Sequence, residues 1–171
     1  MPRQPILDPG GLARATERLG SLVPGYSGYK SRERAREEDR ALREMVSRQL
    51  GLVVGRMERA LSHAVRTLPP DDVEQASALL RMLGRHRDRI RFAPAGYASL
   101  FGRKKIQLTE LEQLISLDAG VWSVLEELDR LAGAWDEGAR RGRPEWPREA
   151  IREAVISLEE QIEERENYLR S

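Results

Sequence analysis

One stretch of the sequence sets the architecture of this chain: residues 42–68, LREMVSRQLGLVVGRMERALSHAVRTL. Its apolar side chains recur at steps of 4, 4, 3, 4, 4, 3 and 4 residues, at Leu42, Val46, Leu50, Val53, Met57, Leu61, Ala64 and Leu68. That spacing places them on one face of an α-helix, and the eleven-residue repeat is typical of a nearly straight helix. Charged residues before Leu42 continue at helical spacing, and Pro69-Pro70 ends the segment. We therefore predict one long helix over about 31–68.

Three other segments show helical apolar spacing and are long enough to pack beside it. They are residues 71–91, 109–137 and 147–170. A shorter helix is predicted over 9–22, where Asp8 can cap the first turn. Thr109 and Glu112 match a Ser/Thr-x-x-Glu capping box and indicate where the segment 109–137 begins.

Short connections between long helices favour antiparallel neighbours. No segment alternates apolar and polar residues over the length of a strand, so no β-sheet is expected. The sequence therefore predicts an all-α protein: an antiparallel up-down four-helix bundle with one long helix at about 31–68 and a short N-terminal helix. With 171 residues, near the commonest domain size, the chain is expected to form a single helical domain over 1–171.

The composition narrows the class of protein. Charged residues make up 33% of the chain and apolar residues 40%, which fits a bundle with a narrow core and wide solvated faces. The chain has no cysteine, which excludes a disulfide framework, a thiolate metal site and a cysteine nucleophile. It shows no secretory signal and no apolar run approaching ~18 residues. We therefore expect a cytoplasmic protein without a membrane span.

Residue patterns that carry catalysis are nearly missing from the sequence. The two histidines, His63 and His86, lie on different predicted helices, and neither belongs to a Glu-x-x-His or His-Glu-x-x-His spacing. The phosphate-binding P-loop and the Gly-x-Ser-x-Gly nucleophile motif do not occur. The sequence thus predicts no enzyme, no catalytic or metal-binding residues, and no cofactor.

Positive charge is concentrated in the first part of the chain. Residues 1–105 hold 21 of the 29 Lys and Arg side chains but only 12 of the 28 acidic ones. One 25-residue stretch contains a single acid, Asp88, and eight basic residues: Arg81, Arg85, Arg87, Arg89, Arg91, Arg103, Lys104 and Lys105. These side chains could contact the phosphates of a nucleic acid or another polyanion. Alternatively, they pair within the bundle with the acidic residues of 109–137 and 147–170.

Two loops are rich in glycine and aromatic residues. The first is Pro24-Gly-Tyr-Ser-Gly-Tyr-Lys30, and the second covers residues 92–102. Together they offer a candidate ligand or partner site lined by aromatic rings, with a cation at its edge that could meet an anion: Tyr26, Tyr29, Lys30, Arg34, Tyr97 and Phe101. The alternative interpretation is that the tyrosines plug the end of the bundle and hydrogen-bond the loop backbone.

The first loop and the Arg/Glu-rich helix start after it carry a resemblance. The segment Pro-Gly-Tyr-x-Gly-Tyr-Lys resembles one in a family of uncharacterised bacterial all-helical proteins, in which Gly-Tyr-x-x-Leu/Phe-Phe follows later; here residues 96–101, Gly-Tyr-Ala-Ser-Leu-Phe, are similar. The resemblance covers two short segments, about a fifth of the chain. It implies a helical fold and supplies no activity.

These features lead to three predicted functions. The first is a non-catalytic helical interaction or scaffold module that acts through protein partners or self-association, because heptad spacing in 109–137 and 147–170 leaves surface for helix-to-helix contacts. The alternative is polyanion or nucleic-acid binding through the Arg81–Lys105 region. The second alternative is a small-molecule or anion site at the Gly/Tyr loops.

Overall fold

The computed structural model describes residues 7–31, 33–93, 99–102, 106–143 and 145–171. These residues form helices and no strand, which confirms the predicted all-α fold. The helices are α1 (Pro9–Leu22), α2 (Ala35–Ala64), α3 (Pro70–Arg91), α4 (Ser99–Gly102), α5 (Leu108–Arg140) and α6 (Arg148–Arg170).

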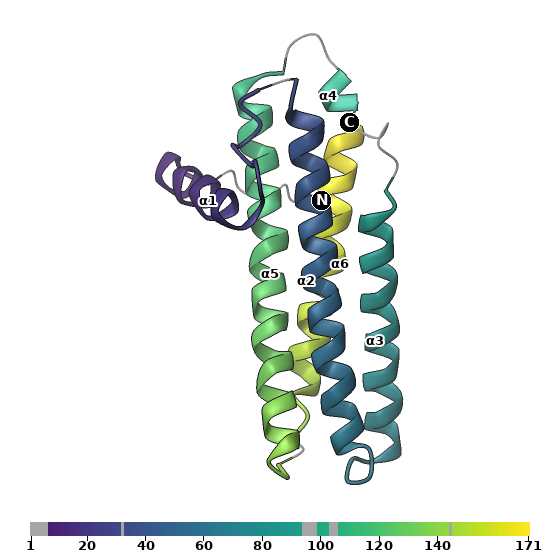
Figure 1. Ribbon diagram of the computed structural model, residues 1–171. Coiled ribbons are helices and arrows are strands. Elements are labelled where there is room, and N and C mark those ends of the chain that lie inside the picture. The colour runs from purple at the N-terminus through teal and green to yellow at the C-terminus, as the bar shows by residue number, and fades with distance from the viewer. Residues whose placement is uncertain (1–6, 32, 94–98, 103–105, 144) are drawn as a thin grey trace.

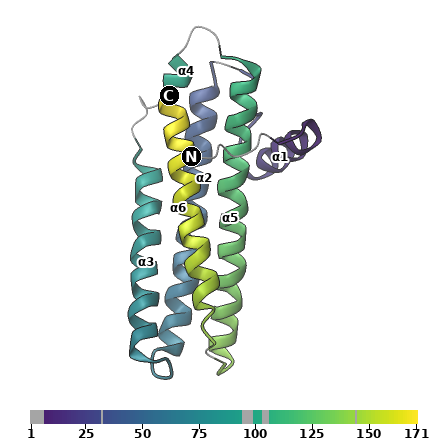
Figure 2. The same ribbon diagram turned by 180° about the vertical axis from the view of Figure 1, so that it is seen from behind.

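The four long helices form a bundle, and the short α1 lies across its outside against α5 (Figure 1). α2 contacts α3 and α5, while α6 contacts α5 and α3, so the order around the bundle is α2, α3, α6, α5. Successive long helices alternate in direction, as the up-down prediction requires. The predicted antiparallel arrangement holds for only part of the bundle. Because α3 and α5 occupy opposite corners, α2 and α5 are parallel neighbours, and so are α3 and α6 (Figure 2).

The long helix α2 is shorter at both ends than the predicted 31–68. It starts at Ala35 because the preceding residues belong to the folded Gly/Tyr loop, whose backbone nitrogens bond the carboxylate of Glu38. It ends at Ala64, whose carbonyl accepts hydrogen bonds from the backbone of Leu68 and from the hydroxyl of Thr67. These contacts close the chain into a turn before the two prolines.

The start of α5 also differs from the prediction. The capping box is formed by Gln107 and Glu110, two residues before the predicted pair Thr109 and Glu112, so α5 begins at Leu108. A glutamine side chain accepts the N3 backbone hydrogen bond here in place of a hydroxyl. At α1 the predicted cap is confirmed, because the carboxylate of Asp8 accepts from the backbone nitrogen of Gly11.

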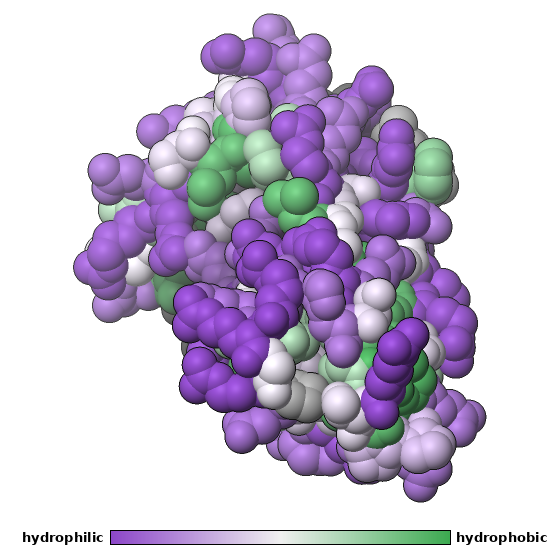
Figure 3. Space-filling view, turned by 60° about the horizontal axis from the view of Figure 1, so that its bottom comes forward, coloured by the Kyte–Doolittle hydropathy of each residue, from purple (hydrophilic) through white to green (hydrophobic). Residues whose placement is uncertain are grey.

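A continuous apolar core runs along the bundle. Fully buried side chains include Leu50 and Met57 on α2, Leu125 on α5 and Ile151 on α6. Burial of one such side chain contributes about 1.5–3 kcal/mol, so these stripes are the main source of stability. Seen towards the end where α5 and α6 join, the surface is largely hydrophilic, with apolar patches bordered by hydrophilic side chains (Figure 3). No helix in the described part of the chain is long and apolar enough to cross a membrane.

Candidate functional site

The Gly/Tyr loop between α1 and α2 contains backbone conformations that few residues adopt. Gly25 and Gly28 have φ values of 79° and 77°, and Tyr29 has a φ of 60°. A left-handed conformation costs an L-residue about 1–2 kcal/mol, so the surroundings of Tyr29 must compensate for it. Part of that compensation comes from Glu38 on α2, whose carboxylate accepts from the backbone nitrogens of Ser27 and Tyr29, each at 2.9 Å.

Both tyrosines of this loop direct their hydroxyl groups to a carboxylate inside the bundle. Tyr26 and Tyr29 donate to Oδ2 of Asp118 on α5, at 3.0 and 2.6 Å. Arg165 on α6 donates from Nε to Oδ1 of Asp118 at 2.6 Å, and from Nη2 to Oδ1 of Asp39 on α2 at 2.7 Å. We call these five residues the Asp118 cluster. It joins the loop to three of the four bundle helices.

The members of the Asp118 cluster are all buried, with exposed fractions from 1% for Asp118 to 8% for Asp39. Burial raises the pKa of Asp118, and the charge of Arg165 offsets part of that rise. Burial also raises the pKa of Tyr29 well above its ordinary value, so its hydroxyl stays protonated and donates. Burial alone would lower the pKa of Arg165, but the charges of Asp118 and Asp39 outweigh it and raise that pKa.

The aromatic rings of the two loops meet beside the Asp118 cluster. The rings of Tyr26 and Tyr29 pack edge to face, with centroids 5.3 Å apart. The ring of Phe101, on α4, lies 5.6 Å from that of Tyr29. The structure therefore brings together three of the predicted aromatic residues from segments more than 70 positions apart in the sequence.

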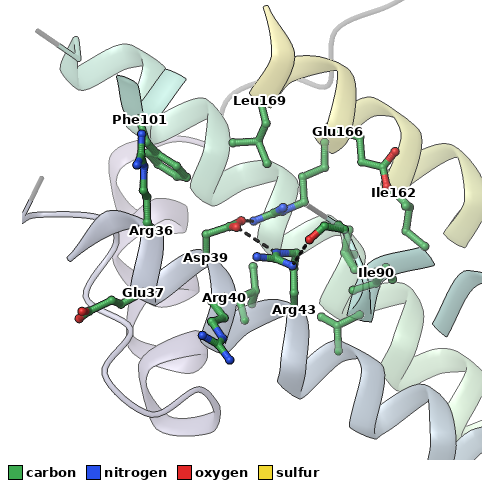
Figure 4. A pocket seen from close by; sticks show the side chains of 15 residues that line it. Arg36, Glu37, Asp39, Arg40, Arg43, Ile90, Phe101, Ile162, Glu166 and Leu169 are labelled. Carbon is green, nitrogen blue, oxygen red and sulfur yellow. Dashed lines mark hydrogen bonds and ion pairs between the residues drawn. The ribbon is translucent and has the colours of Figure 1, made fainter. Parts of the chain in front are cut away.

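A cavity of about 280 Å³ lies next to the Asp118 cluster, at the same end of the bundle as the Gly/Tyr loop (Figure 4). Its apolar walls come from α4 and from all four bundle helices: Leu42, Val46, Ile90, Phe101, Val121, Ile162 and Leu169. Its charged lining is mostly arginine, with Arg36, Arg40 and Arg43 on α2 and Arg165 on α6. Three acids, Glu37, Asp39 and Glu166, complete the charged part.

The arginine side chains at the cavity are held to different degrees. Arg43 is fixed, because its Nε donates to Oδ2 of Asp39 at 3.0 Å and its Nη1 to the carbonyl of Ala93 at 3.2 Å. Arg165 reaches from α6 to the same Asp39, with its Nη2 2.7 Å from Oδ1. Arg40 is exposed and pairs with Glu44 one turn further along α2, at 3.0 Å. Glu166 is held by Arg89 of α3 at 2.6 Å.

The remaining residues of the predicted loop site take other positions. Lys30 and Arg34 are exposed and do not line the cavity. Tyr97 lies outside the described residues. The hydroxyls of Tyr26 and Tyr29 bond a side-chain carboxylate and not the loop backbone. Of the predicted site residues, Tyr26, Tyr29 and Phe101 therefore pack together as a buried group. Of these three rings, only Phe101 lines the adjacent cavity.

The predicted basic region is divided among several environments. Arg89 pairs with Glu163 and Glu166 of α6, as the intramolecular interpretation expects, and Arg87 pairs with Asp88. The guanidinium of Arg91 lies 5.4 Å from the ring centroid of Phe92. Arg81 and Arg85 are exposed on α3. The last three basic positions, Arg103, Lys104 and Lys105, lie outside the described residues.

The central residues of the site, Asp118, Arg165 and Asp39, were not among the candidates from sequence. A signal for two of them exists. Arg165 occupies the one polar step in the apolar stripe of α6, and Asp118 is the one charged residue in the run from Leu114 to Val121. A charged residue at a core position needs a charged partner, so two such positions on neighbouring helices suggest an ion pair.

Comparison of the chain with protein-family models, with curated proteins and with solved structures gives no match in any of the three. The likeness to a bacterial helical family therefore stays a prediction. Within the described residues, no group of three His, Asp or Glu side chains is arranged to hold a metal ion. What the site offers is an apolar volume bordered by guanidinium groups.

Proposed function

We propose that this protein is a non-catalytic helical module that binds a small amphipathic anion, a molecule with a hydrocarbon body and a negatively charged end. The observation that carries the proposal is the 280 Å³ cavity, which has apolar walls and an arginine-rich charged lining. Ligand sites are typically concave and mostly apolar, with a few polar groups that fix orientation, and the smallest measure about 300 Å³. A small ligand suits this volume.

The charges around the cavity favour an anion. Four arginines and three acids line it, and two of those acids are already engaged: Asp39 by Arg43 and Arg165, and Glu166 by Arg89. Arg36 and Arg40 of α2 are exposed and can turn towards a bound charge. A hydrocarbon body would bury its surface against Leu42, Val46 and their neighbours, at about 25 cal/mol per Å².

A fluorescence titration with 8-anilinonaphthalene-1-sulfonate, itself an amphipathic anion, tests the proposal. We expect saturable binding with one site per chain and displacement by decanoate. Val46→Phe should fill part of the cavity and weaken binding at least tenfold. The matched control is Val54→Phe, which places the same side chain two turns further along α2, away from the cavity lining.

The titration separates a cavity site from surface adsorption of the dye. Retained folding of both variants is checked by circular dichroism. Equal affinity of Val46→Phe and Val54→Phe would place the dye elsewhere and contradict the proposal. A wild-type protein that binds neither the dye nor decanoate would also contradict it.

The other two predicted functions stay predictions. A helical interaction module is compatible with a bundle that exposes isolated apolar side chains such as Leu52, at 54%, and Leu108, at 71%. Nucleic-acid binding through the Arg81–Lys105 region loses part of its support, because Arg89 is engaged by two acids of α6.

A further inference from the structure

A second hollow lies on the other side of Arg43, on the surface between α2 and the end of α3. Its volume is about 650 Å³, and we call it the arginine groove. Its lining is Arg40, Arg43, Glu44, Ser47 and Arg48 from α2, with Arg91, Phe92 and Ala93 at the end of α3. Four guanidinium groups and one carboxylate thus line this groove.

The arginine groove and the apolar cavity have a common wall. Arg40, Arg43 and Ala93 line both of them. Arg43 is the fixed part of that wall, because its Nε and Nη1 are bonded to Asp39 and to the carbonyl of Ala93. Its Nη2 makes no hydrogen bond to any described residue. An apolar volume therefore lies on one side of this wall and a cationic groove on the other.

The ion pairs within the groove leave two of its cations uncompensated. Arg40 is paired with Glu44, and Arg43 with Asp39. Arg48 and Arg91 form no ion pair with any described residue, and both are exposed. Phe92, with 72% of its surface exposed, places an apolar ring beside Arg91.

Two free guanidinium groups suit a phosphate better than a carboxylate. A phosphate monoester carries about −1.5 to −2 charge at pH 7 and three acceptor oxygens, and arginine binds it through paired N–H donors. A carboxylate would neutralise one cation and leave the other facing it unused. The carbonyl end of α3 opposes an anion, but its partial charge of about −0.5 is small against two full positive charges.

We infer that the arginine groove and the cavity form one site for an alkyl phosphate. Arg48 and Arg91 hold the phosphate, and the hydrocarbon chain extends from the groove over the shared border of Arg40, Arg43 and Ala93 into the cavity. This inference rests on the proposed function and names the head group of its ligand. It adds two residues, Arg48 and Arg91, that do not line the cavity itself.

Isothermal titration calorimetry on the full chain with four probes tests the inference. The probes are decyl phosphate, decanoate, decanol and inorganic phosphate. We expect decyl phosphate to bind at least tenfold more tightly than decanoate, and inorganic phosphate to bind most weakly because it lacks the chain. The double variant Arg48→Gln/Arg91→Gln should lower the affinity for decyl phosphate to that for decanoate and leave decanol unchanged.

The control is Arg66→Gln/Arg85→Gln, which also removes two exposed arginines, one in the turn after α2 and one on α3, neither of which lines the groove. Full affinity for decyl phosphate in the control and reduced affinity in the groove variant support the inference. Equal affinity for decyl phosphate and decanoate in the wild type overturns it, although binding of both would keep the proposed function. Binding of an oligothymidylate that competes with inorganic phosphate but not with decanol would also overturn it, in favour of a nucleic-acid ligand.

Discussion

Replacing Arg165 by methionine should destabilise the protein strongly, because the guanidinium of Arg165 is the only cation that contacts Asp118 within the described residues. Its Nε lies 2.6 Å from Oδ1 of Asp118, and its Nη2 lies 2.7 Å from Oδ1 of Asp39. Asp39 keeps a second partner, Arg43, at 3.0 Å. Asp118 keeps only the two tyrosine hydroxyls. Methionine therefore leaves one buried carboxylate without a counter-charge.

Loss of one partner from a buried ion pair costs about 3–5 kcal/mol, against a total stability of about 5–15 kcal/mol for a domain of this kind. Urea unfolding followed by circular dichroism measures the change at pH 7.5. The control Arg152→Met, at an exposed position of the same helix, removes an ion pair with Glu149 and should change stability by less than about 1 kcal/mol.

Acidification should reduce the deficit of Arg165→Met. Burial already raises the pKa of Asp118, and loss of the guanidinium raises it further. A carboxyl group whose pKa is higher in the folded state contributes most to stability at low pH and loses that contribution as pH rises. The variant should therefore approach the wild type as pH falls towards 4. The double variant Asp118→Asn/Arg165→Met should be more stable at pH 7.5 than Arg165→Met alone. A loss below about 1 kcal/mol, or strictly additive effects in the double variant, would refute this account.

Three other predictions concern the loop, the cluster and a buried histidine. Gly28→Ala should cost about 1–3 kcal/mol in urea unfolding, because the new Cβ would lie 3.1 Å from Cδ1 of Ile115 at a φ of 77°. Gly25→Ala, at a φ of 79° with open space around it, should cost less. Equal costs for the two variants would show that the Ile115 contact does not matter. Tyr29→Phe removes the 2.6 Å donor to Asp118 and should cost about 1–3 kcal/mol by the same measurement. Unchanged stability would show that this hydrogen bond does not support the cluster. Burial lowers the pKa of His86 below its ordinary value of 6.5. The free energy of unfolding should therefore fall as the pH drops below 6.5, by at most about 1.4 kcal/mol per pH unit. His86→Gln should remove this part of the pH dependence.

The helices could be predicted from the sequence because their apolar spacing is a local property. Predicted and observed bounds of the segment 71–91 differ by one residue, and those of 9–22 agree. The largest discrepancies are at the two ends of α2, each four residues from the prediction. At its start a helical pattern continues to Ser31, but the chain follows the Gly/Tyr loop. That choice depends on the backbone hydrogen bonds to Glu38, which form only when the loop folds back on α2.

The candidate site could be predicted only in part for a related reason. The glycine and tyrosine content indicates the loop, and three of the predicted aromatic residues, Tyr26, Tyr29 and Phe101, do lie together. The pairing of Asp118 with Arg165 spans 47 residues and two helices, so no local spacing records it. The cavity is still less accessible from the sequence, because its volume depends on how side chains from five helices fail to fill the space between them.

The position of the Asp118 cluster connects the fold to the proposed ligand site. A buried ion pair is often no more stabilising than well-packed apolar residues of similar size, so stability alone is a weak reason for one. Here Arg165 holds Asp39 from one side while Asp39 holds Arg43 from the other. Arg43 is thereby fixed in the wall between the apolar cavity and the arginine groove, before any ligand arrives. A site whose wall is fixed before binding loses less entropy on binding than one whose side chains must first be ordered. In the proposed site the Asp118 cluster supports Arg43, and Tyr26 and Tyr29 support the cluster by donating to Asp118.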